Sequence, residues 1–200
     1  MRLETAALLI AVVLLTAAGI APAAAQDTSI LKPPKGAKVA LVVFEDLQCP
    51  DCRRASSLLQ DAVKAYKIPL VRYDFPLPQH NWAFEAHVMA RWFDLKSRET
   101  GNEFREYIFA NQPQITRDSL RGYAQRFAAQ HKLSLPFAVD PRGTLAAKVK
   151  ADYTLGQRAG VSHTPTIYVV SETTTGKPFV EVVDRSQLFQ LIDEMKRRTN

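Results

Sequence analysis

The sequence predicts one α/β domain with an inserted helical subdomain, built in the order β-α-β, helices, β-β-α. Three observations support this order. Residues 39–75 show the hydrophobic pattern of a strand, a helix and a second strand, and residues from about 81 to 158 show mostly helical spacing. Residues 166–198 then show two strands and an amphipathic helix. Because the helical block separates two halves of one sheet, we expect an insertion and not a separate terminal domain.

The first strand and helix have the clearest patterns. Residues 39–44, Val-Ala-Leu-Val-Val-Phe, are continuously apolar and rich in β-branched side chains, which is typical of a strand buried on both faces. Residues 53–66 place apolar side chains at helical intervals, and Pro69 follows the end of this predicted helix. Residues 69–75 then predict the second strand, so the first unit is β-α-β.

The rest of the chain divides at glycine, proline and asparagine residues. Helices are expected over 82–96, 103–110, 116–131 and 141–156. Residues 166–170 and 178–183 predict strands on either side of a Thr/Gly turn at 173–176, which indicates a hairpin. Residues 186–198 predict the closing helix.

The N-terminal residues 1–25 have the features of a cleaved signal peptide. Arg2 gives a short basic start, residues 6–20 are almost wholly apolar, and Ala-Ala-Ala at 23–25 offers a cleavage site before Gln26. The apolar run is short for a membrane span, so we expect cleavage instead of a retained anchor. The protein is therefore expected in the periplasm or another extracytoplasmic compartment.

The mature chain is expected to have an arm over 26–38, which contains two prolines and a glycine, and one domain over 39–200. The formal net charge is +6 at pH 7, and the basic residues are scattered, so no nucleic-acid partner is expected. A domain of this length needs no disulfide to be stable. The two cysteines are therefore better explained by chemistry.

Cys49 and Cys52 lie between the first predicted strand and the first predicted helix. A cysteine at a helix N-terminus faces unpaired backbone N–H groups and the positive end of the helix dipole, and both favour the thiolate. We therefore predict that Cys49 is a nucleophile and that Cys52, one turn later, is a buried resolving thiol. Pro50 suits the first helical turn, where its missing N–H has no cost.

Two metal-binding alternatives use the same pair. Cys-x-x-Cys is also half of a zinc site, but the histidines lack the compact spacing of a zinc finger. A second alternative is a carrier that holds a soft metal such as Cu(I) between Cys49 and Cys52. We expect no metal and no organic cofactor, because a dithiol carries the two electrons of disulfide exchange itself.

A resemblance to a known family rests on two motifs. Phe44-x-Asp46-x-x-Cys49-Pro50-x-Cys52 resembles the active-site segment of the DsbA-like thioredoxin-fold family, and Gly160-Val161-x-x-Thr164-Pro165-Thr166 resembles its cis-proline loop. The resemblance implies a thioredoxin fold with a helical insertion and protein-disulfide oxidoreductase activity. It also implies that Thr164 and Pro165 lie against the cysteine pair and offer backbone groups to an extended peptide. A cis bond before Pro165 is independently plausible in this turn.

The family resemblance also suggests partners. Substrates would be exported proteins with thiols or disulfides, and a membrane redox partner would restore the pair. Residues 26–38 are too few for a separate dimerisation domain, so a monomer is expected. The direction of exchange, oxidase against reductase or isomerase, stays open from the sequence.

The chain departs from relatives of this kind in one buried position. Thioredoxin-like proteins often carry an acid six residues before the first cysteine, where this chain has Val43. Asp46 is the candidate replacement as a proton acceptor for the Cys52 thiol. The alternative is that Asp46 caps the active-site turn.

Further residues are candidates for tuning the pair. Asp51 stands where strongly oxidising members have histidine, and its carboxylate should repel the Cys49 thiolate and make the pair less oxidising. His163, two residues before the cis-proline position, could reach the mouth of the site. His80 is expected in a loop or at a helix start, and His87 at a surface or interhelical position.

Overall fold

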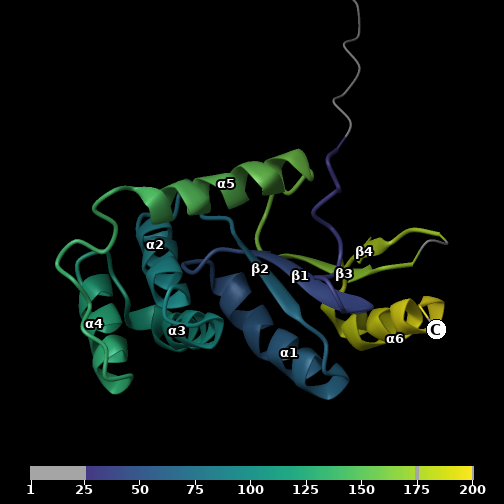
Figure 1. Ribbon diagram of the computed structural model, residues 1–200, viewed down its shortest axis with the longest axis horizontal. Helices are drawn as coiled ribbons and strands as arrows, with labels where there is room; N and C mark the ends of the chain where they lie inside the picture. The colour runs from purple at the N-terminus through teal and green to yellow at the C-terminus, as the bar shows by residue number, and fades with distance from the viewer. Residues whose placement is uncertain (1–25, 174–175, 200) are drawn as a thin grey trace, which may run out of the picture.

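The computed structural model describes residues 26–173 and 176–199; the predicted signal peptide and part of the predicted hairpin turn lie outside these ranges. A four-stranded sheet with the order β2-β1-β3-β4 forms the centre, with helices on both of its faces (Figure 1). This is the α/β thioredoxin fold with helices inserted between β2 and β3, so the predicted fold class is confirmed. Within the described ranges, no helix has the length and hydropathy needed to cross a membrane.

The strands are β1 (Val39–Glu45), β2 (Leu70–Asp74), β3 (Thr166–Ser171) and β4 (Phe179–Glu181). The helices are α1 (Pro50–Tyr66), α2 (Ala83–Asp94), α3 (Arg98–Asn111), α4 (Leu120–Gln130), α5 (Thr144–Arg158) and α6 (Leu188–Arg198), with 3₁₀ turns η1 (Gln112–Gln114) and η2 (Arg185–Gln187). α1 begins three residues before the start that the hydrophobic pattern predicted, because Pro50 occupies its first position.

The central strand β1 pairs in parallel with β2 and antiparallel with β3. All seven of its residues are buried, which confirms the prediction of a strand covered on both faces. On one face Leu41 and Val43 pack in one core with Leu59 of α1 and Ile192 of α6. On the other face Phe44 packs against Phe75 and Tyr168, and the arm adds Leu31 to this second cluster.

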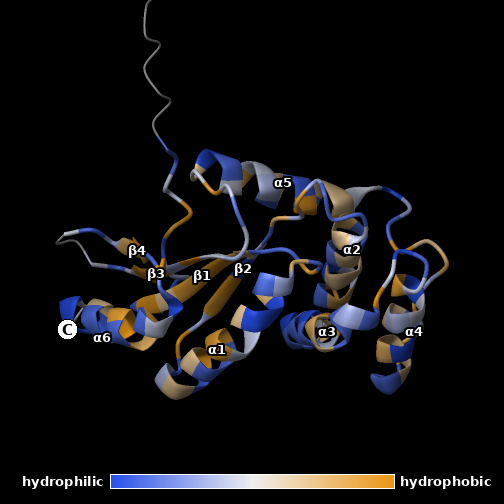
Figure 2. Cartoon of the chain, turned by 180° about the vertical axis from the view of Figure 1, so that it is seen from behind, coloured by the Kyte–Doolittle hydropathy of each residue, from blue (hydrophilic) through white to orange (hydrophobic). Residues whose placement is uncertain are grey.

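The inserted helices have an aromatic core of their own, in which Phe93 contacts Phe104 and Phe127. This core also includes Cys49 and Cys52. Figure 2 shows hydrophobic residues concentrated on the strands, whereas both colours alternate along α1, α2 and α6. The cysteine pair therefore lies where the sheet and the helical insertion meet.

Candidate active site

The two cysteines occupy the turn from β1 into α1. Cys49 is the N-cap of α1, with extended backbone angles of φ −74° and ψ 120°, and Cys52 lies in the first turn. Both are free thiols, and their exposed fractions are 7% and 3%. The turn from a buried strand into a helix that starts with proline thus places the Cys49 sulfur at a helix N-terminus.

The environment of Cys49 stabilises its thiolate. The pKa of Cys49 is lowered to about 5, chiefly by a hydrogen bond from the Cys52 thiol. Burial opposes this shift, but contact with Thr164 and the backbone N–H groups of Cys52 and Asp51 add to it. Cys49 is therefore ionised at neutral pH.

Cys52 has the opposite environment. Its pKa is raised well above the usual thiol value, first by burial and then by the neighbouring Cys49. The Asp46 backbone N–H points at the Cys52 sulfur, with 3.4 Å between nitrogen and Sγ. One ionised and one protonated sulfur is the asymmetry that a nucleophile and a resolving thiol require.

The cis-proline loop lies against the nucleophile. The Thr164–Pro165 peptide bond is cis, as the sequence suggested. As a thiol, Cys49 Sγ donates to the Thr164 carbonyl oxygen at 3.4 Å, which joins two motifs separated by 115 positions in the chain. His163 is exposed and lines a hollow of about 430 Å³ with Leu77, Tyr153, Ser162 and Thr164.

Asp46 lies beside the pair, but its carboxylate is directed elsewhere. It is fully buried, and its Oδ1 accepts from the Gln48 N–H at 2.7 Å. Its Oδ2 accepts from the Leu77 N–H at 2.6 Å and from Nδ1 of His80 at 2.8 Å. These three donors favour the capping interpretation over the proton relay, and they give His80 a fixed partner.

The Asp51 carboxylate is paired with two arginines. Its Oδ1 accepts from Nη2 of Arg185 at 2.7 Å and from Nε of Arg54 at 3.2 Å. Burial opposes ionisation of Asp51, but Arg185 and then Arg54 outweigh it and lower the pKa. The acid predicted to repel the Cys49 thiolate therefore carries a compensated charge.

His87 corrects one expectation from the sequence. It is fully buried, so the surface alternative is wrong, and it connects β2 with the loop before Cys49. Its Nε2 accepts from the Leu47 N–H at 3.3 Å, and its Nδ1 donates to Asp74 at 2.8 Å. Gln112 supports the same loop by donating to the carbonyl of Leu47 at 2.9 Å. Helical spacing placed His87 on α2 but did not show that this side of α2 faces the sheet.

A buried ion pair beneath the site was not predicted. Glu45 is 2% exposed, and its two carboxylate oxygens accept from Arg72 at 2.8 and 2.9 Å. Arg72 also pairs with Glu106 of α3, and Glu45 contributes to the raised pKa of Cys52. The available signal was an acid that directly follows a strand buried on both faces, because such an acid needs a partner.

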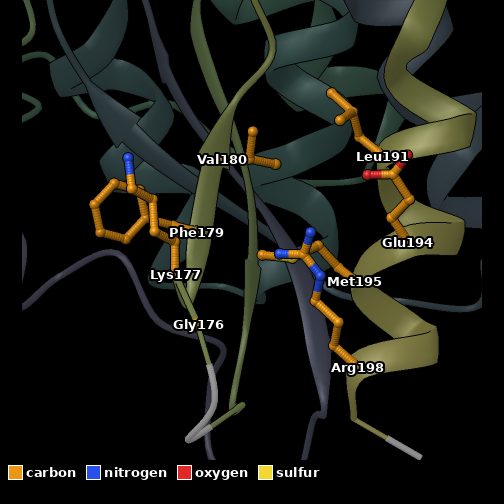
Figure 3. A pocket seen from close by; sticks show the side chains of 8 residues that line it. All are labelled: Gly176, Lys177, Phe179, Val180, Leu191, Glu194, Met195 and Arg198. Atoms are coloured by element: carbon orange, nitrogen blue, oxygen red, sulfur yellow. The ribbon is translucent and has the colours of Figure 1, made fainter.

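Two other observations bear on what the protein could hold. No group of three or more His, Cys, Asp or Glu side chains within 26–173 and 176–199 is arranged around a common metal position. A pocket of about 610 Å³ is lined by residues of β4 and α6, and Val180 points across it toward Leu191, whereas the ring of Phe179 points away from α6 (Figure 3). None of the residues predicted for the active site lines this pocket.

The chain matches the family model described as thioredoxin over residues 28–193. Among solved structures it is similar to alpha-DsbA1 of Wolbachia pipientis, with a TM-score of 0.67 and 14% identity, covering 84% of this chain and 90% of that chain. It is also similar to DsbA2 of Pseudomonas aeruginosa, with a TM-score of 0.58, 18% identity and coverages of 82% and 92%. A periplasmic thioredoxin-like protein from Salmonella enterica serovar Typhimurium is also similar, with a TM-score of 0.64, 20% identity, and coverage of 82% of this chain and 87% of that chain. A search of curated protein sequences found no match.

Proposed function

This chain belongs to the thioredoxin family, and we propose that it is a DsbA-like protein-disulfide oxidoreductase that exchanges disulfides with exported proteins through Cys49 and Cys52. The observation that carries the proposal is the asymmetry of the pair. Cys49 has a pKa of about 5, and the buried Cys52 has a pKa well above the usual thiol value. No resident cofactor is needed for this chemistry, because the pair itself stores two electrons.

The thiolate at Cys49 favours transfer of the disulfide to the substrate, because it stabilises the reduced form of the pair. A substrate thiolate attacks Cys49 Sγ of the oxidised pair, the Cys49–Cys52 bond breaks, and Cys52 takes its electron pair and one proton. A second substrate thiolate attacks the substrate sulfur of the mixed disulfide. Cys49 then leaves as the thiolate, and the second substrate proton passes to solvent. The substrate has lost two electrons to the cysteine pair.

The hollow beside the cis-proline loop is the proposed binding site for the substrate peptide. Thr164 lines it and also contacts Cys49, so a peptide held there would place a cysteine near the reacting sulfur. Leu77 and Tyr153 also line it and supply apolar surface. An extended peptide along Thr164 and Pro165 would be recognised mainly through its backbone, which suits an enzyme with many substrates.

An extracytoplasmic location is supported by the predicted signal peptide at 1–25, since an oxidising compartment is where protein disulfides persist. The Salmonella structure that the chain resembles is described as periplasmic. After each transfer the reduced pair must be reoxidised, and we propose a membrane partner that passes the electrons to a quinone. The protein is proposed to act as a monomer.

The decisive experiment measures turnover and metal content together. Oxidation of a reduced, unfolded substrate protein by wild type should be lost in both Cys49→Ser and Cys52→Ser. Mixed with a disulfide-bonded substrate, Cys52→Ser alone should accumulate a mixed disulfide, because the Cys49 thiolate breaks the substrate disulfide, one substrate sulfur leaves as a thiolate, and no resolving thiol remains. Purified wild type that holds stoichiometric copper and shows no thiol-dependent turnover would contradict the proposal and favour the Cu(I) carrier.

A pH titration tests the electronic basis of the proposal. Thiolate absorbance near 240 nm in the reduced wild type should rise with a midpoint at about pH 5, the pKa of Cys49. Cys49→Ser should abolish this step, and Cys52→Ala should move it upward because the first cause of the low pKa is the Cys52 thiol. A wild-type midpoint above pH 8 would show that the site does not favour the thiolate.

A further inference from the structure

We infer that Arg185 is a positioning residue of the active site: it holds the Asp51 carboxylate away from Cys49 and so keeps the acid between the two cysteines from opposing the thiolate. The inference rests on the proposed function and adds a residue outside both recognised motifs. Arg185 lies 134 positions after Asp51 in the sequence, and nothing in the local pattern around either residue connects them.

The geometry of the contact is specific. Nη2 of Arg185 donates to Asp51 Oδ1 at 2.7 Å, and its Nη1 reaches the Asp51 backbone oxygen at 3.4 Å. One guanidinium therefore contacts both the side chain and the backbone of the residue between the cysteines. A planar group with several N–H donors can make this double contact, whereas a lysine could not make it in the same way.

Arg185 is better anchored than the other cation on Asp51. The Arg54 side chain is 62% exposed and lies one turn along the same helix, so it follows the movements of α1. Arg185 follows Asp184, whose Oδ1 accepts from the Ser186 N–H at 2.9 Å and fixes the turn η2. That turn leads directly into α6, whose first residue, Leu188, is fully buried. The hydrophobic core thus holds the backbone of Arg185 relative to Asp51.

The alternative position of the Asp51 carboxylate explains why the anchor matters. Asp51 is the second residue of α1, and acidic side chains in the first turn of a helix are attracted to its free N–H groups. The backbone N–H groups of Asp51 and Cys52 are among those that stabilise the Cys49 thiolate. A released carboxylate would compete with the sulfur for these donors and would add a negative charge beside it.

A double-mutant cycle tests the inference, with Arg185→Gln, Asp51→Asn and the combined variant. The readouts are the Cys49 titration at 240 nm and the equilibrium of the pair with glutathione, neither of which requires a protein substrate. Arg185→Gln should raise the Cys49 pKa by about one unit and make the pair about tenfold less oxidising. In the Asp51→Asn background the same substitution should change the equilibrium less than about threefold, because no carboxylate remains to be released. Arg185→Lys should recover part of the wild-type value.

The matched control is Arg53→Gln, which removes the same charge from an exposed residue of α1 that has no described contact with Asp51. It should change the equilibrium less than about twofold. Thermal unfolding of each variant shows whether the fold is retained. Equal effects of Arg185→Gln in both backgrounds would overturn the inference, because Arg185 would then act only as a separate charge, and so would the absence of any effect. Failure of the proposed function appears separately, as turnover that survives Cys49→Ser in the wild-type background.

Discussion

Two of the contacts that the central sheet makes with its surrounding helices are built from different chemistry. Below β1, α6 packs with Leu188 and Ile192, which are fully buried in an apolar cluster. At the end of β2, the inserted helices meet the sheet through Asp74, which is fully buried among charged partners. Arg91 of α2 and Arg105 of α3 both pair with this carboxylate.

The two contacts should respond differently to pH and to the removal of a side chain. Apolar packing is not directional, and its strength follows the buried area at any pH. A buried ion pair is directional, and removing one partner leaves an uncompensated charge in the interior. The contact with α6 should therefore resist changes of pH, whereas the contact with the inserted helices should depend on them.

The largest loss is expected where the ionic contact is broken at its centre. Burial opposes ionisation of Asp74, but His87, Arg105 and Arg91 outweigh it and hold the pKa of Asp74 well below its usual range. Asp74→Ala removes the fully buried carboxylate that contacts His87, Arg91 and Arg105, and should lower the free energy of unfolding by about 3–5 kcal/mol. The two arginines keep Asp94 and Asp152 as partners. Urea unfolding at pH 7 measures this, and a loss below about 1 kcal/mol would mean that the cluster contributes little.

A smaller loss is expected on the apolar side. Ile192→Ala removes a fully buried side chain from the cluster between α6 and the sheet. The expected loss is about 3 kcal/mol, within the usual range for such a truncation. The same urea experiment at pH 5 and pH 7 should give equal losses, because no neighbouring charge is involved. Losses that differ strongly between the two pH values would remove the contrast between the two contacts.

The smallest expected effect is a change of folding stability with pH at Asp152, which only the ionic contact should show. Burial and then Asp74 raise the pKa of Asp152 in α5 to about 6, although Arg91 acts in the opposite direction. A raised pKa means that the folded state binds the proton more tightly. The stability from this group is fully present below the unfolded pKa of 3.8 and is lost as pH rises through about 6.

Asp152→Asn removes this titration while keeping an oxygen that can accept from the Asp74 N–H. The stability of wild type relative to the variant should therefore fall by about 2 kcal/mol between pH 4 and pH 7. Urea unfolding of both proteins across this range gives the difference directly. Parallel stability curves would contradict the raised pKa, and Ile192→Val serves as a control without a titrating group.

Local patterns in the sequence were sufficient for much of the fold. The apolar, β-branched run of β1 predicted its burial on both faces, and the helical intervals after Cys52 predicted α1. The structure confirms both. The start of α4 was predicted too early, at residue 116, because Thr116 and Ser119 form a hydrogen-bonded turn before the helix begins at Leu120. Polar side chains that bond to nearby backbone compete with the helix at such a boundary.

The surroundings of the candidate site were predicted less completely. The pattern around Cys49 indicated a helix N-terminus, and the family resemblance paired it with Pro165. The long-range partners of Asp46, Asp51 and His87 could not be predicted, because each of these partners lies on a segment distant in the chain. Hydrophobic periodicity reports which side of an element is buried, but it does not report which polar group it meets there.

The pairing of the Cys49–Cys52 segment with a cis-proline loop came from the family resemblance. By itself the sequence determined the order of the elements and the placement of Cys49 and Cys52 at the start of a helix. These properties depend on short-range periodicity and on the steric demands of proline. Only the tertiary structure decided the charge environment of the pair, because electrostatic interactions act through space. Folding brings Arg185 to Asp51, so the residue that seemed to oppose the Cys49 thiolate is held in an ion pair.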